Sequence, residues 1–188
     1  MWWSEMRLVV ILARLAPVMA ITVLLGGCFQ PLYSERTIGG GNESVAQALR
    51  HVDVAEVKTP RGTRIDRVGF EIRNNLIYGL TGGQGGAAPA YRLNINLNAT
   101  QQQIVVDASS GRAEVQNYGI DALYTLTELA TGKVVVRSAT SSRVSFNIPG
   151  QQQRFAGERG LRDAENRAAG VIAEAIRNRL ASYFTAGT

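Results

Sequence analysis

Apolar and polar residues alternate along the middle of the chain. Between positions 91 and 99 the odd-numbered residues are tyrosine, leucine, isoleucine and alanine, and the even-numbered ones are arginine and asparagine. A period of two returns at 118–126, continues along 134–146, and marks a shorter segment at 52–57. This period is typical of β-strands that bury one face and leave the other wet, as in antiparallel sheets. We therefore expect four strands, with the apolar residues 104–106 continuing the second.

Two other segments repeat their apolar residues every three or four positions, which predicts helices with one apolar face. The first face consists of Ile65, Val68, Ile72, Leu76 and Leu80, and the second of Leu161, Ala164, Ala168, Val171, Ile172, Ala175, Ile176, Leu180 and Tyr183. Thr63 can cap the first helix, and Gly82 and Gly83 end it. The second helix spans 151–184, where glycines at 157, 160 and 170 predict a frayed start or a bend. Its wet side should carry the ion pairs Glu158–Arg162 and Asp163–Arg167, each four residues apart.

The predicted elements follow one another as β-α-β-β-β-α, with turns at 59–62, 109–112 and 130–133. Two helices with apolar stripes can cover one face of a four-stranded sheet. The fold class expected is therefore α+β, a two-layer sandwich with a mostly antiparallel sheet and both helices on one face.

The N-terminal region has a different composition. Arg7 and Arg14 precede a short apolar run that ends in Leu25-Gly26-Gly27-Cys28, the arrangement of a signal peptide. The run is interrupted by Pro17 and is too short for a membrane span. Cys28 has no second cysteine to pair with, and its setting resembles a bacterial lipobox, in which the thiol receives a lipid and the chain is cut before it. We expect a signal peptide at 1–27 that begins at Met1 or Met6, a lipidated tether at 28–42, and one α/β domain at 43–188.

The formal net charge of +5 at pH 7 weakly favours an acidic partner. Lys58 and Lys133 are the only lysines, and arginine is the better residue for forked phosphate contacts, although a coding bias explains the preference equally well. The best candidates for phosphate contacts lie at or near turns: Arg112, Lys133, Arg137 and Arg143. Arg137 and Arg143 are six residues apart and should face the same side of one strand. The alternative is that these are solvated surface charges. Tyr118 and Tyr124 share a strand face, either in the core or in a surface patch.

The residues needed for catalysis are scarce. His51 is the single histidine, and no Gly-x-Ser-x-Gly sequence accompanies it. One histidine and a lipidated cysteine cannot make a usual zinc site. The glycine runs at 39–41 and 82–86 lack the Lys-Ser/Thr of a phosphate loop. We predict a protein that is not an enzyme, with no metal, no cofactor other than the covalent lipid on Cys28, and no nucleic-acid partner.

The segment Gly27-Cys28-Phe29-Gln30-Pro31-Leu32-Tyr33 resembles the start of the mature LPS-assembly lipoproteins of the LptE family in alphaproteobacteria. That family commonly carries a glycine after the cysteine, where this chain has Phe29. The predicted order of elements is similar to the two-layer fold of the family.

The resemblance implies an outer-membrane lipoprotein that sits as a plug in the lumen of the LptD β-barrel on the periplasmic side. It also implies binding of lipopolysaccharide during its transport to the outer leaflet. Two alternatives are a periplasm-facing lipid- or glycan-binding lipoprotein with no obligate barrel partner and an envelope hydrolase, which the lone histidine disfavours.

Overall fold

The computed structural model describes residues 44–83, 85–106, 113–148 and 154–186. Their elements are α2 (Val45–Arg50), β1 (Val52–Val54), α3 (Arg64–Thr81), β2 (Tyr91–Val106), β3 (Ala113–Glu128), β4 (Val134–Asn147) and α4 (Arg154–Ala186). Cys28 and the rest of 1–43 lie outside the described residues.

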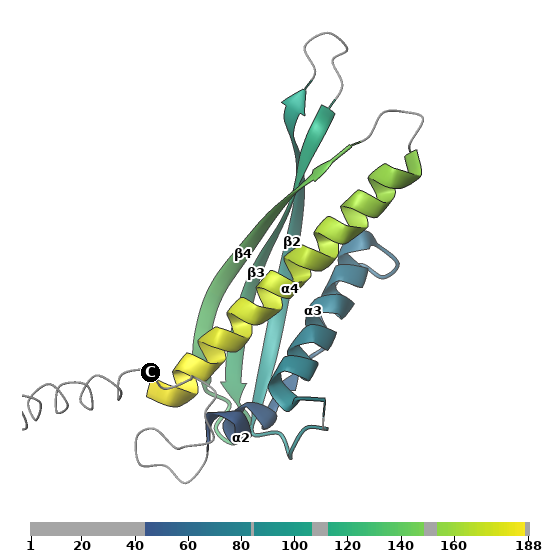
Figure 1. Cartoon of the computed structure of the whole chain (residues 1–188). Coiled ribbons are helices and arrows are strands. Elements are labelled where there is room, and N and C mark those ends of the chain that lie inside the picture. The colour runs from purple at the N-terminus through teal and green to yellow at the C-terminus, as the bar shows by residue number, and fades with distance from the viewer. Residues whose placement is uncertain (1–43, 84, 107–112, 149–153, 187–188) are drawn as a thin grey trace, which may run out of the picture. The chain divides into compact units, whose positions relative to one another are not determined.

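The four strands form one sheet in the order β1-β2-β3-β4. β1 runs parallel to β2, and the other two pairings are antiparallel. The helices lie on one side of this sheet, with α4 running beside α3 (Figure 1). The predicted class, an α+β sandwich with a mostly antiparallel sheet, is confirmed.

The alternation of residue types assigns the two faces of the sheet correctly. Leu93 of β2 pairs with Leu126 of β3, which pairs with Val136 of β4, and all three side chains are buried beneath the helices. Neighbouring residues such as Asn94 point to the opposite face and are exposed. The antiparallel register therefore places apolar residues of three strands in line on one face, which the helices then cover.

The helices supply the other half of the core. Val68, Ile72, Leu76 and Leu80 of α3 are buried, as their spacing predicts. Along α4, large buried residues such as Ile172 and Ile176 alternate with buried alanines, among them Ala164 and Ala168, all with no exposed surface. Small side chains allow the helix backbone to lie close to its neighbours. Val171, which we expected in the stripe, is instead 51% exposed.

Three features of the helices and strands differ from the predictions made from the sequence. A short helix, α2, precedes the first strand, because Ser44 and Gln47 form a capping box in which each side chain accepts a hydrogen bond from the other's backbone N–H. β1 has three residues rather than the six expected, since pairing with β2 ends at Val54. α4 is unbroken through its glycines, and Figure 1 shows no bend in it.

A polar cluster is enclosed between α3, α4 and β3. Glu165 of α4 is only 2% exposed, and its Oε2 accepts a hydrogen bond from Arg67 of α3. Arg67 also donates to Asn166 Oδ1 at 3.1 Å. Within the described part of the chain, Glu165 Oε1 and the Tyr118 hydroxyl have no hydrogen-bond partner. Burial, and next the nearby charge of Glu165, raise the pKa of Tyr118 to about 12.

Replacing Tyr118 by phenylalanine should leave the protein as stable at pH 7 and make it more resistant to alkali. The hydroxyl has no hydrogen-bond partner among the described residues, so its removal loses no bond to them. Because the folded-state pKa of about 12 exceeds the unfolded value of about 10, the neutral phenol contributes stability in full below pH 10. That contribution, at most about 3 kcal/mol, is lost as pH rises toward 12. Denaturant unfolding at pH 7 and pH 11 measures the free energy of unfolding of both proteins. An equal decrease between the two pH values in the wild-type protein and in Tyr118→Phe would contradict the prediction.

Candidate functional site

In the described part of the chain, all of the helices lie on one side of the sheet (Figure 1), and we call the other side the open face. It is built from the outward-pointing side chains of β2, β3 and β4. Its rows across the three strands are Asn94–Thr125–Arg137, Asn96–Leu123–Ala139, Asn98–Asp121–Ser141, Thr100–Gly119–Arg143 and Gln102–Asn117–Ser145. Most of these groups are amides and hydroxyls, which hydrogen-bond without carrying charge. The open face is therefore a long and mainly polar surface that also carries the ion pairs Arg143–Asp121 and Arg92–Asp53. Leu123 is an apolar exception at 62% exposed.

Arg143 lies flat across this face and is fully engaged. Its Nη2 donates to both carboxylate oxygens of Asp121 at 2.8 and 3.0 Å. Its Nη1 donates to the carbonyl oxygens of Ile120 and Ser142 at 3.1 and 3.0 Å. These bonds hold the guanidinium against the sheet, so Arg143 is not a free fork for a phosphate group.

Gly119 provides the space that Arg143 occupies. A Cβ added at Gly119 would lie 2.7 Å from Cδ of Arg143 and 2.8 Å from Oγ1 of Thr100, both closer than ordinary van der Waals contact. Glycine in the middle of a strand weakens the strand and often marks a close approach by another group. Here the approaching group is the aliphatic part of an arginine from the neighbouring strand.

Arg137 and Lys133 differ from Arg143 in that their charges are free. Arg137 lies opposite Thr125 on the open face and is exposed. Lys133 precedes β4 at the hairpin turn, where only its backbone is bonded, to Thr131 and Glu128. Within the described residues neither side chain makes an ion pair or hydrogen bond. They are the two available cations at this end of the open face.

The four bases predicted as phosphate contacts therefore do not form one cluster. Arg137 and Arg143 share a face, as their spacing predicts, but six strand residues separate them by roughly 20 Å. Arg112, like Cys28, lies outside the described residues. Sequence reasoning did not identify Asp121 as the partner of Arg143, because that pairing depends on the register of β3 against β4. Gly119, a glycine inside an alternating strand, was the available signal.

His51 and the charged residues of the pocket beside β1 make hydrogen bonds within the domain. The Nδ1 of His51 lies 2.7 Å from the carbonyl oxygen of Ala88, at the C-terminal end of α2. A pocket of about 210 Å³ beside β1 is lined in part by Asp53 and Arg73. Asp53 accepts a hydrogen bond from Arg92, and Arg73 donates one to the carbonyl oxygen of Val54. Among the described residues there is no group of three potential metal ligands. In the same part of the chain, none of the helices is both long and apolar enough to span a membrane.

Comparison with solved structures shows a shared fold. A protein from Caulobacter crescentus CB15 classed as a lipoprotein matches with a TM-score of 0.57 and 22% sequence identity, over 76% of this chain and 96% of that one. Rare lipoprotein B from Shewanella oneidensis matches with a TM-score of 0.48 and 11% identity, over 70% and 93% of the two chains. A minor lipoprotein from Acinetobacter baumannii matches with a TM-score of 0.45 and 9% identity, over 70% of this chain and 88% of that one.

The last two TM-scores are below 0.5, so the shared fold rests on the Caulobacter protein. No protein-family model and no curated protein sequence matches the chain. The resemblance to the LptE family seen at residues 27–33 therefore stays a prediction.

Gly119→Ala should lower the free energy of unfolding by about 1–3 kcal/mol, because the new methyl group displaces Arg143 and crowds Thr100. The same change in an Arg143→Ala background should cost at least about 0.5 kcal/mol less. Gly170→Ala is the matched control, since a Cβ there meets nothing within 4 Å and alanine favours the helix, so it should stabilise. Denaturant unfolding measures the free energy of unfolding of these four variants and of the wild-type protein. Equal costs in the two backgrounds would show that Gly119 does not make room for Arg143.

Proposed function

We propose that this chain is an outer-membrane lipoprotein of lipopolysaccharide assembly, anchored by lipid on Cys28. In this proposal it occupies the lumen of an LptD-type β-barrel and engages lipopolysaccharide on its way to the outer leaflet. The observation that carries the proposal is the open face, a long and mainly uncharged polar surface, while the helices of the described residues lie on the other side of the sheet (Figure 1). The motif at 27–33 and the fold shared with a Caulobacter protein classed as a lipoprotein support it.

The chemistry of the open face suits the inside of an outer-membrane barrel. The interiors of outer-membrane barrels are polar, and along each strand polar inward residues alternate with apolar outward ones. Amides and hydroxyls can exchange bonds to water for bonds to such a wall, whereas a densely charged face would lose strong hydration. The charge of Arg143 is neutralised by Asp121 within the chain itself. The chain thus works by fit and binding, and we propose no catalytic step, metal or nucleic-acid partner.

The free cations give the proposed contact with lipopolysaccharide. Lys133 and Arg137 are exposed at one end of the open face, beside hydroxyls such as that of Thr125. Lipid A carries phosphates, which accept charge-assisted hydrogen bonds from such groups. An alternative is a periplasm-facing lipid- or glycan-binding lipoprotein with no barrel, for which the same amides and hydroxyls would bind sugar hydroxyl groups.

Purification of the lipidated chain in detergent distinguishes the two functions. We expect a large β-barrel to co-purify in stoichiometric amount, which the barrel-free alternative does not require. Metabolic labelling with a fatty acid checks that the chain carries lipid, and Cys28→Ser should abolish the label because no other thiol is present. A labelled chain that purifies alone would favour the alternative, and label retained by Cys28→Ser would refute lipidation at this residue.

Replacing Lys133 and Arg137 together by glutamate should weaken lipopolysaccharide binding at least tenfold at low salt. Each lost charge-assisted contact is worth about 1.5 kcal/mol or more, and about 1.4 kcal/mol is a factor of ten. The loss should shrink at high salt, where exposed charges are screened. Lys58→Glu with Arg179→Glu makes the same charge change at exposed residues away from the open face and should have little effect. Equal affinities for both double variants at low salt would place the lipid contact elsewhere.

A further inference from the structure

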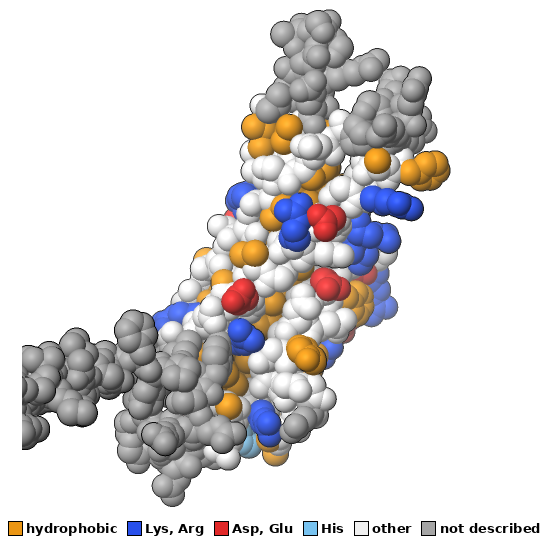
Figure 2. All heavy atoms as spheres, viewed as in Figure 1, with side chains coloured by type: hydrophobic (Ala, Val, Ile, Leu, Met, Phe, Trp, Pro, Cys, Tyr) orange, Lys and Arg blue, Asp and Glu red, His pale blue; other side chains and the backbone are white. Residues whose placement is uncertain are grey.

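Arginines gather on the outer side of the helical layer, where α3 begins beside the first turns of α4. We call this region the arginine flank and define it by Arg61, Arg64, Arg67, Arg159 and Arg162. Three side-chain contacts join the two helices here: Arg64 Nη2 lies 3.1 Å from Glu158 Oε2, Arg67 Nη1 donates to Asn166 Oδ1 at 3.1 Å, and Arg67 Nη2 donates to Glu165 Oε2. Figure 2 shows the basic side chains gathered on this flank.

Three acidic groups beside these arginines, Glu158, Asp163 and Asp66, are already engaged, whereas Glu56, which lines the hollow beside Phe70, makes no ion pair within the described residues. Glu158 pairs with Arg64 rather than with Arg162, so the predicted Glu158–Arg162 pair is wrong. The other predicted pair, Asp163–Arg167, is present at 2.7 Å. Asp66 accepts hydrogen bonds from the Gly62 N–H and the Thr59 hydroxyl, which lower the pKa of its carboxyl group.

Arg61 acts electrostatically on Asp66, which leaves the guanidinium groups of two arginines. Arg159 and Arg162 are exposed and make no ion pair or hydrogen bond within the described residues. The first turns of α4 therefore carry two positive charges that no ion pair of the described residues balances, and they suit an anionic partner.

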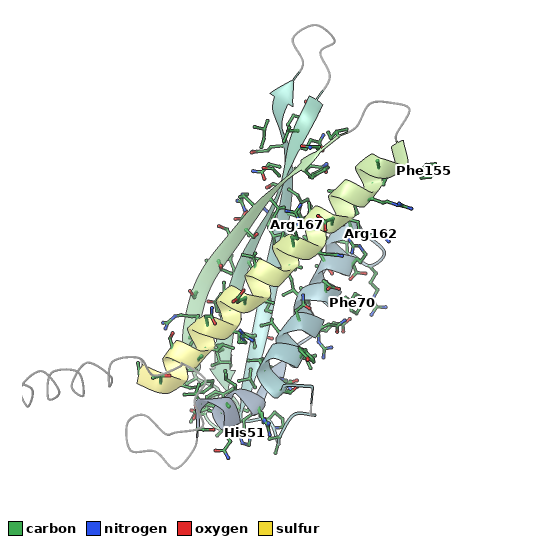
Figure 3. All side chains as sticks on the ribbon, viewed as in Figure 1. His51, Phe70, Phe155, Arg162 and Arg167 are labelled. Carbon is green, nitrogen blue, oxygen red and sulfur yellow. The ribbon has the colours of Figure 1, made fainter. Side chains whose placement is uncertain are left out.

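Two phenylalanines flank these arginines and are unusually exposed. Phe155 is 85% exposed and shares a helix face with Arg159 and Arg162, four and seven residues later. Phe70, 52% exposed, follows Arg67 by one turn of α3. Figure 3 shows Phe155, Arg162 and Phe70 along the same side of the helical layer. Exposed aromatic rings beside free arginines are typical of surfaces that bind at the boundary between lipid head groups and acyl chains.

We propose that the arginine flank docks onto the surface of an anionic phospholipid bilayer. Arg159 and Arg162 bind lipid phosphates, and Phe155 and Phe70 enter the boundary region. A bilayer fits better than a single enclosed lipid, because the hollow beside Phe70 is only about 10 Å³ and cannot hold an acyl chain. This docking is proposed for the chain outside the barrel, since a chain inside the lumen does not face a bilayer. Docking by this flank leaves the open face, on the other side of the sheet, uncovered.

A tryptophan placed in the flank tests the proposal on the lipidated, processed chain. The native tryptophans are Trp2 and Trp3, ahead of Cys28, so Phe155→Trp would introduce the sole tryptophan after processing. In vesicles of phosphatidylcholine with phosphatidylglycerol, its emission should shift to the blue and be quenched by brominated acyl chains. In phosphatidylcholine alone, or at high salt, both effects should disappear.

Two controls separate docking by the flank from mere attachment through the lipid. Val171→Trp, at a residue that is 51% exposed on the opposite side of α4, should remain unquenched in both vesicles. Adding Arg159→Gln and Arg162→Gln to Phe155→Trp should lower the docking equilibrium roughly 30-fold, since each arginine near an anionic surface contributes about 1 kcal/mol. Lys58→Gln with Arg179→Gln should change it far less.

Equal quenching of Phe155→Trp in both vesicles, or quenching that survives loss of Arg159 and Arg162, would overturn the proposal. No quenching in either vesicle would overturn it as well. Unchanged thermal unfolding of each variant confirms that its fold is kept. The result is independent of the proposed lipopolysaccharide contact, which is tested at Lys133 and Arg137.

Discussion

One-sided packing of the helices on the sheet is the constraint on which the rest of the structure depends. The buried sides of β2, β3 and β4 meet α3 and α4, and the row Leu93–Leu126–Val136 lies at most 4% exposed. Burying a side chain of this size contributes about 1.5–3 kcal/mol, so a row shared by three strands fixes their register. A slip of one residue would place the asparagines of β2 in the core and expose its leucines.

That register also determines the chemistry of the open face. It aligns Gly119 with Arg143 and brings Asp121 within reach, so the arginine lies flat and its charge is neutralised. The same register leaves Arg137 opposite Thr125, with no carboxylate bonded to it in the described residues. Two arginines six residues apart on one strand thus have different roles, one within the surface and one available to a partner. The difference arises from the facing strand.

The features that repeat along the sequence were predictable, and the features that depend on pairing were not. The period of two placed β2, β3 and β4 and assigned their faces, and the helical period found α3 and α4. Val171 was wrongly predicted to be buried, because the apolar face predicted from hydrophobicity alone was wider than the face of α4 that is buried. The short helix α2 has only six residues, too few for a periodic signal, and its capping residues Ser44 and Gln47 were the remaining clue. The ion pair of Glu158 joins residues 94 positions apart and could not be inferred from helical spacing.

The two sides of the fold differ in a way that bears on how a lipid-anchored chain would lie. On the sheet side, the exposed groups are mainly uncharged amides and hydroxyls, which gain little from a charged surface. On the helix side, unpaired arginines stand beside exposed phenylalanines, which gain from both parts of a lipid boundary. A chain held near a bilayer by its N-terminal lipid would therefore be oriented by the helices, where unpaired arginines lie beside exposed phenylalanines. The sheet would then face away from the lipid, where its polar groups can meet a polar partner.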